Sequence, residues 1–203
     1  LIYALDDDLL ALPPGRLPLT SQDGSGSPEE LRWVVKHLLQ NADGILVTTP
    51  ALRKRFSGLN PNIVVIPQAL DERLVVGREL TGGRSPYGPR KRVVGCMGTF
   101  THDQDLMMVL PALRSVSESH PGAVEFQIIG VAGRDDTLDA LRGLPVRFLT
   151  PMPEEHAYPL FMLWFTSRVR WDIALAPLKD IRFNRCKSDI KFLDYSVIGA
   201  AGI

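Results

Sequence analysis

The chain has 203 residues, and its 23 lysines and arginines balance 23 aspartates and glutamates, so its formal net charge is zero. Such a chain has no overall field to attract nucleic acid or an anionic membrane, and we expect no nucleic-acid partner. With 45% hydrophobic and 23% charged residues, a disordered chain is excluded and a sizeable core is expected. Cys96 and Cys186 cannot form a disulfide framework or a zinc site alone, so we expect a reducing compartment.

The two ends of the sequence are unusual. The sequence begins at Leu1, without Met, directly in an apolar run, and residues 199–203 read like the start of a further strand. We therefore expect a piece of a longer protein that is truncated at both ends. No apolar run approaches the roughly 20 residues that a membrane-spanning helix needs.

Residues 1–71 predict the order strand, helix, strand, helix, strand. The apolar run 1–5 ends in three aspartates, as a buried parallel strand does. Ser27 is a suitable N-cap, with Pro at the first helical position and Glu30 completing a capping box, for an amphipathic helix that ends before Gly44. Thr49 and the following proline begin a short basic helix. The remaining predicted strands of this part are 45–48 and 63–66.

Residues 72–90 interrupt this alternation with glycines, prolines and arginines, and we interpret them as a linker that crosses between two parts. From residue 91 each strand is again followed by a helix, which predicts a parallel, doubly wound α/β sheet whose strands pair directly. The predicted strands are 93–97, 124–129, 146–149 and 172–176; the helices are 103–119, 135–142, 154–168 and 188–198. We expect Trp33, Trp164 and Trp171 to be packing residues.

In doubly wound sheets, ligands bind beyond the carboxyl ends of the strands, and two loops there contain glycine. The loop from Gly98 to His102 places a small residue and hydroxyls before a helix N-terminus, which can receive an anion. A plain turn capped by Thr101 or Asp103 explains the same residues. The glycines of loop 130–133 allow either close approach to a ligand or a tight turn.

A third candidate is the segment in which Lys187, Lys191 and Asp194 follow one another at i, i+4 and i+7. With Ser188 as N-cap, the three side chains share one helix face. Two ammonium groups suit a diphosphate, and a carboxylate one turn further suits a ribose diol. The alternative is an exposed amphipathic helix that buries Ile190, Leu193 and Val197 and carries an ordinary ion pair between Lys191 and Asp194.

The fourth candidate is the run of Asp6, Asp7 and Asp8 at the end of the first strand. Clustered carboxylates can hold Mg²⁺ or sugar hydroxyls. They also resemble the acidic strand end of a response regulator, but strand 45–48 offers no phosphoacceptor aspartate. The sequence contains no Gly-x-Gly-x-x-Gly or Walker-type loop, which argues against a dinucleotide dehydrogenase or a P-loop NTPase.

These segments, in this order, resemble the retaining nucleotide-sugar glycosyltransferases of the GT-B fold, in particular family 4 enzymes of surface-polysaccharide and O-antigen synthesis. The matching segments are Tyr3 to Leu10, Ala42 to Thr49, Ile63 to Asp71, Gly98-Thr99, Asp172 to Leu178, and Phe183 to Gly199. The resemblance implies an α/β fold of Rossmann-like parallel sheets flanked by helices. It makes residues 1–71 the end of the acceptor-side domain, 72–90 a linker, and 91–203 an incomplete donor domain.

The resemblance also orders the candidate residues around a donor. Many members of the family carry two acidic residues eight positions apart, the first toward the sugar and the second toward the ribose. Asp194 falls at the second position, whereas Cys186 falls at the first, where a thiol cannot replace a carboxylate that accepts sugar hydroxyls. The expected diphosphate contacts are Gly98, Thr99, His102, Lys187, Ser188 and Lys191. The expected ribose contact is Asp194, and Asp6, Asp7 and Asp8 lie on the sugar or acceptor side.

The resemblance implies transfer of a hexose from a nucleotide-diphosphate sugar to a polysaccharide or lipid-linked acceptor, with retention and without a metal or other cofactor. It places the catalytic residue in the missing N-terminal segment and the cleft, so we expect this chain alone to be inactive. It implies a cytoplasmic enzyme at the inner membrane face, associated with the membrane peripherally through missing parts. The alternative is a non-catalytic nucleotide-sugar-binding or interaction module of the same fold, favoured by Cys186.

Overall fold

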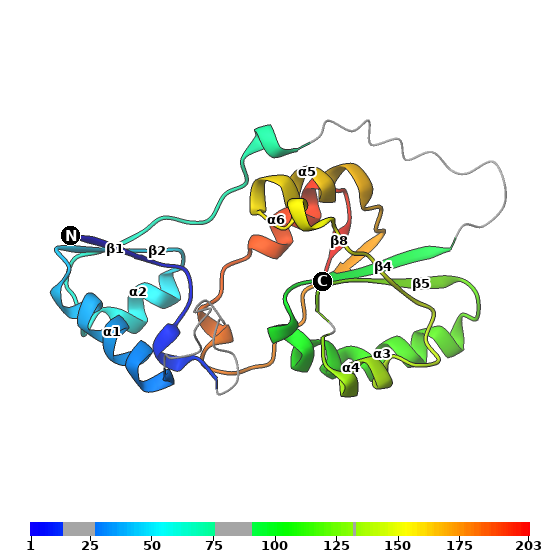
Figure 1. Cartoon of the computed structure of the whole chain (residues 1–203), viewed down its shortest axis with the longest axis horizontal. Helices are drawn as coiled ribbons and strands as arrows, with labels where there is room; N and C mark the ends of the chain where they lie inside the picture. Colours follow the sequence, from blue (N-terminus) through cyan, green and yellow to red (C-terminus); the bar gives the residue numbers. More distant parts are fainter. Residues whose placement is uncertain (14–26, 76–90, 132) are drawn as a thin grey trace. The chain divides into compact units, whose positions relative to one another are not determined.

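The structure is a computed structural model that describes residues 1–13, 27–75, 91–131 and 133–203 (Figure 1). The chain divides into two compact units. The first comprises residues 1–69 and 180–189, and the second comprises residues 70–179 and 190–203. Most of the expected linker 72–90 lies outside the described residues, and the domain boundaries remain a prediction.

The first unit contains a three-stranded parallel sheet in the order β1-β2-β3. The strands are β1 (Ile2–Leu5), β2 (Gly44–Val47) and β3 (Ile63–Val65). The crossover helices α1 (Pro28–Asn41) and α2 (Pro50–Phe56) lie on one face of the sheet (Figure 1). The capping box predicted at Ser27 and Glu30 is confirmed, and the Thr49 hydroxyl accepts the amide of Leu52 at 3.1 Å.

The second unit contains a five-stranded sheet in the order β6-β5-β4-β7-β8, with every pair parallel. The strands are β4 (Arg92–Met97), β5 (Val124–Ile129), β6 (Val146–Phe148), β7 (Ile173–Leu175) and β8 (Ala201–Gly202). The four strands expected from residue 91 onward therefore pair directly with one another, which confirms the prediction. The α/β fold class is likewise confirmed.

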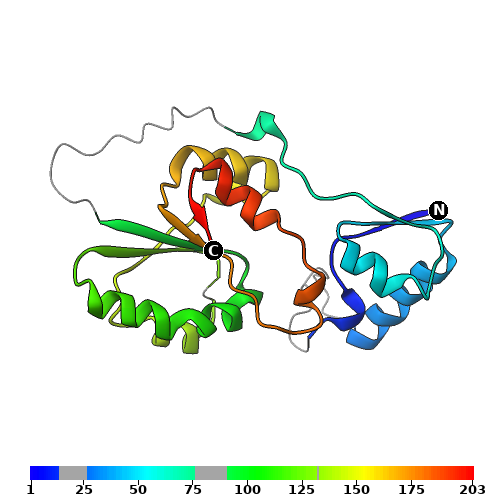
Figure 2. The same cartoon turned by 180° about the vertical axis from the view of Figure 1, so that it is seen from behind.

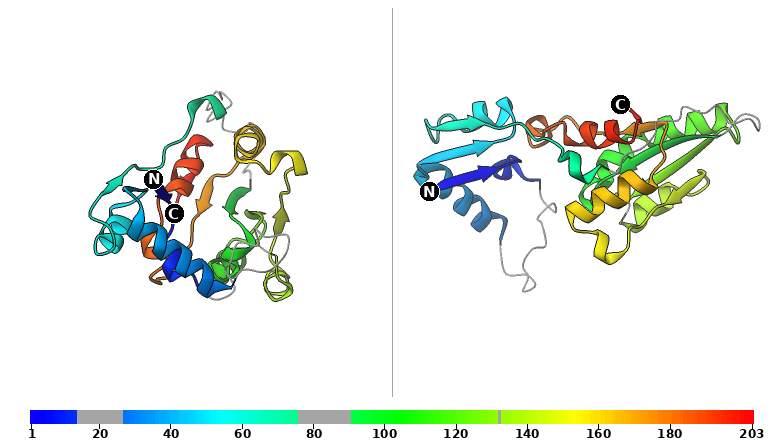
Figure 3. Two further views of the ribbon diagram at one scale, coloured as in Figure 1. Left: turned by 60° about the vertical axis from the view of Figure 1, so that its left-hand side comes forward. Right: turned by 90° about the horizontal axis from the view of Figure 1, so that it is seen from above.

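Helices cover both faces of this second sheet, as Figure 2 and the left view of Figure 3 show. One layer consists of α3 (Asp103–Ser119) and α4 (Asp135–Ala140), and the other of α5 (Tyr158–Arg168) and α6 (Ile190–Val197). Each layer encloses its own apolar core, one centred on Leu106 and Phe126 and the other on Phe165 and Tyr195. Short 3₁₀ turns occur at Leu9–Ala11, Glu72–Leu74, Phe100–His102, Pro153–Glu155 and Asn184–Cys186.

Helix α6 differs from its prediction in both its start and its buried face. It begins at Ile190 rather than at Ser188, and its buried residues are Asp194 and Tyr195, followed by the buried Ile198 directly after its end. The expected stripe of Ile190, Leu193 and Val197 is only half-buried. The reason is Tyr195, whose hydroxyl donates to the Leu175 carbonyl (3.0 Å) and accepts the Met97 amide (3.3 Å), so the phenol ring turns this face of the helix onto β4 and β7.

The tryptophans follow the expectation only in part. Trp171 is buried and packs over the middle of β4, where a Cβ atom on Gly95 would lie 1.8 Å from its ring; its indole donates to the Gln127 side chain at 3.0 Å. Trp164 packs against the same core. Trp33, however, is 68% exposed, because the apolar side of α1 is already filled by smaller residues. No helix within the described residues is long and apolar enough to span a bilayer.

Candidate functional site

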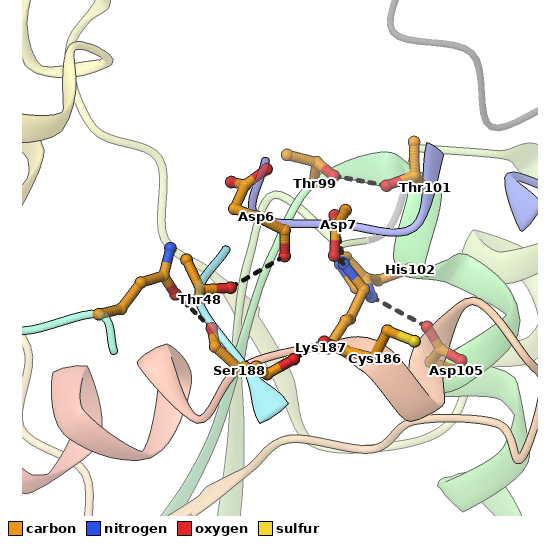
Figure 4. A network of polar contacts seen from close by, with 12 residues as sticks. Asp6, Asp7, Thr48, Thr99, Thr101, His102, Asp105, Cys186, Lys187 and Ser188 are labelled. Atoms are coloured by element: carbon orange, nitrogen blue, oxygen red, sulfur yellow. Dashed lines mark hydrogen bonds and ion pairs between the residues drawn. The ribbon is translucent and has the colours of Figure 1, made fainter. Parts of the chain in front are cut away.

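Asp105 connects three segments at the carboxyl ends of β4 and β7. This fully buried carboxylate accepts the amide of Lys179, in the segment after β7, at 2.9 Å from Oδ1. Its Oδ2 lies 2.9 Å from Nδ1 of His102 (Figure 4), in the turn after β4. The Asp105 contact fixes the orientation of the imidazole ring, because Nδ1 then carries a proton toward the carboxylate.

The loops after β4 and β5 approach each other closely at two glycines. Gly130 has φ of +67°, and a Cβ atom there would lie 2.4 Å from the carbonyl oxygen of Gly98. The Gly98 amide donates to the Ile129 carbonyl at 3.0 Å. No other residue type fits at position 130, because both its backbone conformation and its space exclude a side chain. The two strand-end loops are therefore held together through their backbones.

Lys191 lies against the same loop. A Cβ atom at Gly98 would lie 3.2 Å from Nζ of Lys191, 3.1 Å from Cδ2 of His102 and 3.3 Å from Cγ2 of Val131. The absence of a side chain at Gly98 thus leaves the ammonium and imidazole groups close to the backbone of the loop. An ammonium beside a glycine loop at the end of a parallel strand is an arrangement that suits a phosphate group.

Asp194, one turn after Lys191, is 5% exposed, and its Oδ1 has no hydrogen-bond partner within the described residues. Burial raises the pKa of this carboxyl to about 6, although the charge of Lys191 acts in the opposite direction. Burial and the charge of Asp194 also raise the pKa of Tyr158. A buried oxygen without a partner costs stability unless a ligand supplies a donor, so Asp194 is a suitable acceptor for hydroxyl groups.

The N-terminus of α3 is less suited to an anion than the sequence indicates. Neither Thr101 nor Asp103 caps it; the capping position is His102, without a side-chain cap bond. Asp103 and Asp105 are both buried in the first turn, where their charges already complement the helix dipole. Thr99 and Thr101 bond each other through their hydroxyls at 2.7 Å. Positive charge for a ligand at this edge therefore comes from side chains, above all Lys191.

The other predicted site residues belong to the first unit, and among them Lys187 and Asp7 pair with each other (Figure 4). Lys187 donates to both carboxylate oxygens of Asp7, at 3.1 and 2.9 Å, and the Ser188 hydroxyl bonds the side chain of Gln68. Asp8 is fully buried and accepts Nε of Arg55 at 2.8 Å. These contacts explain how segment 180–189 is held to the ends of β1 and β2.

Asp6 and Cys186 complete this edge of the first unit. The Asp6 side chain is exposed, and its carbonyl accepts the Thr48 hydroxyl at 3.3 Å. The Cys186 thiol is buried, while its carbonyl accepts the Thr49 hydroxyl at 2.9 Å. Burial, together with the nearby charge of Asp8, raises the pKa of the Cys186 thiol above its usual value. The thiol is therefore neutral at physiological pH.

The structure thus groups the candidate residues in two sets. Within the second unit, Gly98, His102 and Lys191 lie together, and Asp194 follows on the same helix. Lys187 and Ser188 belong to the first unit, so the single pocket predicted from the sequence is not formed within one unit. Sequence reasoning missed the role of Asp105. Its only signal in the sequence is that it is the second carboxylate in the first turn of a helix, which is an ordinary feature there.

The fold is similar to that of solved glycosyltransferases of the GT-B type. TarM superposes on 98% of this chain with a TM-score of 0.57 at 10% sequence identity. A mutant of S. aureus TarM in complex with Fondaparinux, alpha-GlcNAc-glycerol and UDP superposes on 85% with a TM-score of 0.50 at 12% identity. The chain spans 35% and 31% of the lengths of these two proteins. No family model and no curated protein matches the sequence.

The fold therefore belongs to the α/β class, with parallel sheets flanked by helices as in GT-B glycosyltransferases. At these identities the likeness concerns the fold alone. The site described above is therefore the basis for an assignment of function.

Proposed function

We propose that the chain is part of a glycosyltransferase that transfers a hexose from a nucleotide-diphosphate sugar to a polysaccharide or lipid-linked acceptor. The observation that carries the proposal is the meeting of Gly98, His102 and Lys191 at the carboxyl end of β4, with the buried Asp194 one turn along α6. The GT-B fold and the UDP bound to a TarM mutant support the same class of donor.

In this proposal the second unit holds the leaving group. As the bond to the sugar breaks, negative charge develops on the diphosphate, and a cation already in place stabilises it. Lys191 supplies that cation, and Gly98 permits the phosphates to approach the backbone. His102, oriented by Asp105, donates a further hydrogen bond when its ring is protonated. Asp194 accepts the ribose hydroxyls through its otherwise unpartnered oxygen.

Retention of configuration, independence of metals and the absence of a further cofactor belong to the proposal, as does action in the cytoplasm at the inner membrane face. Asp6 is the aspartate of the first unit that we place toward sugar or acceptor, because Asp7 and Asp8 are paired with Lys187 and Arg55. The activity requires the complete protein, and the catalytic residue lies outside this chain.

A non-catalytic nucleotide-sugar-binding module of the same fold is the second candidate. The specific observation in its favour is Cys186, which by resemblance occupies the position of the acid that contacts the sugar. A buried, neutral thiol accepts hydroxyl hydrogen bonds far less well than a carboxylate does. Release of nucleoside diphosphate and formation of a glycosidic product by the complete protein separate the two candidates.

Calorimetric titration of this chain with UDP, GDP and dTDP tests the binding part of the proposal. We expect one nucleotide to bind, and Lys191→Ala to weaken it by about 1–3 kcal/mol, the range for loss of a charge-assisted hydrogen bond. We expect Asp194→Ala to weaken nucleotide binding, because the ribose hydroxyls lose their acceptor, and to leave the fold unchanged. Lys54→Ala, an exposed lysine on α2, is the matched control and leaves affinity unchanged. Equal affinity in all variants contradicts the assignment of the site.

A further inference from the structure

Trp33 is the most exposed tryptophan in the described part of the chain, at 68% of its surface. Its indole stacks on the ring of His37, one helical turn later, with centroids 5.4 Å apart and planes 12° apart. The stack presents a broad, oriented ring surface on the outer side of α1. Leaving so large an apolar side chain in water forgoes about 2–3 kcal/mol of burial. A single exposed tryptophan is not evidence of a site, so its surroundings decide what it indicates.

Trp33 lines a hollow of about 540 Å³ that is formed entirely within the first unit. This volume lies within the range of pockets that hold small ligands. The hollow is bounded by the 3₁₀ turn after β1, by α1, and by the end of α2. The residues that line it are Leu10, Arg32, Trp33, Lys36, Arg55, Gly58 and Leu59.

The hollow is positively charged. Three of its lining residues are cations, and no carboxylate is among the described residues that line it. Arg55 is neutralised by Asp8 at 2.8 Å, but Arg32 donates to the neutral carbonyl of Leu12 at 3.2 Å and keeps its full charge. Lys36 is exposed on the same side of α1. The chain as a whole has no net charge, so this excess of positive charge is local.

We propose that this hollow binds a segment of an acidic carbohydrate. The C–H face of a sugar ring packs on the indole of Trp33, and a carboxylate or phosphate on the same or the next sugar is bound by Arg32 and Lys36. A glycan fits these observations better than a membrane surface, because the aromatic ring borders a concave site and the adjoining groups are cations. The site is independent of the proposed donor site, since no donor-site residue lines the hollow.

The test uses the full chain and a set of probes that distinguish recognition of sugar rings from recognition of negative charge alone. The acidic glycan probe is a hexameric oligogalacturonate, with neutral maltohexaose and hexaglutamate as comparisons and vesicles of anionic phospholipid as a fourth arm. The variants are Trp33→Ala and the double variant Arg32→Glu/Lys36→Glu. Phe148→Ala and Arg147→Glu, exposed positions in the second unit, are the matched aromatic and charge controls.

We expect oligogalacturonate to bind more tightly than either comparison molecule. Trp33→Ala then weakens it about tenfold through the lost stacking, and the double charge variant weakens it at least as much. The controls leave its affinity unchanged, and circular dichroism shows all variants folded. The proposal is overturned if hexaglutamate binds as tightly as oligogalacturonate, or if the variants of the hollow bind oligogalacturonate as tightly as the wild type does. It is also overturned if the chain binds only the vesicles. UDP affinity stays constant in every variant, so failure here is distinct from failure of the donor site.

Discussion

The two units each contain a buried aspartate near the ends of their strands, and they compensate it differently. Asp8 in the first unit lies 2.8 Å from the guanidinium of Arg55. Asp194 in the second unit forms no ion pair within the described residues, and burial raises its pKa to about 6. Each carboxylate has one oxygen without a hydrogen-bond partner, but only Asp8 has its charge neutralised at contact distance. A buried carboxylate without compensation reduces stability, and binding sites are where proteins retain such groups.

The polar groups around the two aspartates also differ in how far they are paired with other parts of the protein. In the first unit, the neighbouring polar groups are bound to segment 180–189, as the pairs of Lys187 with Asp7 and of Ser188 with Gln68 show. In the second unit, Asp105 binds His102 and the Lys179 amide, which orders the loops around the glycine at position 98. One edge is held together by its own ion pairs, and the other is the edge at which we propose that the nucleotide binds.

The largest effect is expected from Gly95→Ala, which tests whether the two units unfold separately. The added Cβ would lie 1.8 to 2.3 Å from ring atoms of Trp171, so the indole must leave the core that it shares with Tyr195. We expect a loss of about 3 kcal/mol or more in the second unit. Calorimetry should show one transition moved to lower temperature and the other unchanged. Gly58→Ala, with open space around its Cβ, is the control; a single joint shift contradicts independent units.

The next effect concerns the compensated aspartate. Arg55→Met leaves Asp8 buried with its charge unpaired, and we expect a loss of about 3 kcal/mol in the stability of the first unit. The double variant Asp8→Leu/Arg55→Met removes both charges and should recover most of that loss. Urea unfolding measures both. If the double variant is no more stable than Arg55→Met alone, the ion pair is not the reason why Asp8 is tolerated in the core.

The sequence predicts only part of the difference between the two units. The strands, their parallel pairing and the cap at Ser27 follow from local residue patterns and from the alternation of strands and helices, whereas the order of the strands was not predicted. The burial of Asp194 does not follow from such patterns, because the apolar pattern of α6 indicates a different face. That face is decided by Tyr195, whose hydroxyl finds the backbones of two strands distant in the sequence.

Two further features were missed for a similar reason. Asp105 acts through the amide of Lys179, which the fold brings to it from 74 positions away. Trp33 was assigned to packing because tryptophan is usually at least partly buried, yet it borders a hollow between α1 and α2. Gly95 did carry a signal, since a glycine within a strand often marks a close approach of another group. Residue type predicts local structure, whereas a site depends on which distant segments meet.

The uncompensated aspartate predicts a dependence of stability on pH. The carboxyl of Asp194 has a pKa of about 6 in the folded state and an ordinary value of 3.8 when unfolded. Between about pH 4 and pH 6 the native state therefore keeps a proton that the unfolded chain has released. The free energy of unfolding falls as pH rises through this window, by about 2–3 kcal/mol in total, and is level above it.

The measurement is urea unfolding at pH 4 to 7.5 for the wild type and Asp194→Asn. The amide does not titrate, so the difference in stability between the two proteins isolates the contribution of Asp194. We expect the free energy of unfolding of the variant to rise relative to that of the wild type as pH increases from 4 to 6. A constant difference across this range would mean that Asp194 is compensated in solution, and the contrast with Asp8 would disappear.

The smallest effect is expected from Lys187→Ala, and it decides how far the two edges differ. The ammonium of Lys187 is half-buried and contacts both oxygens of Asp7, so its removal should cost the first unit about 1 kcal/mol or less. Because this charge is already neutralised, we expect the affinity for nucleoside diphosphate to change less than twofold, against the larger loss for Lys191→Ala. Calorimetry on both variants in parallel gives the comparison. If Lys187→Ala weakens the nucleotide as strongly as Lys191→Ala does, the pair with Asp7 must open for the ligand, and the two lysines form the single diphosphate pocket that their spacing in the sequence indicates.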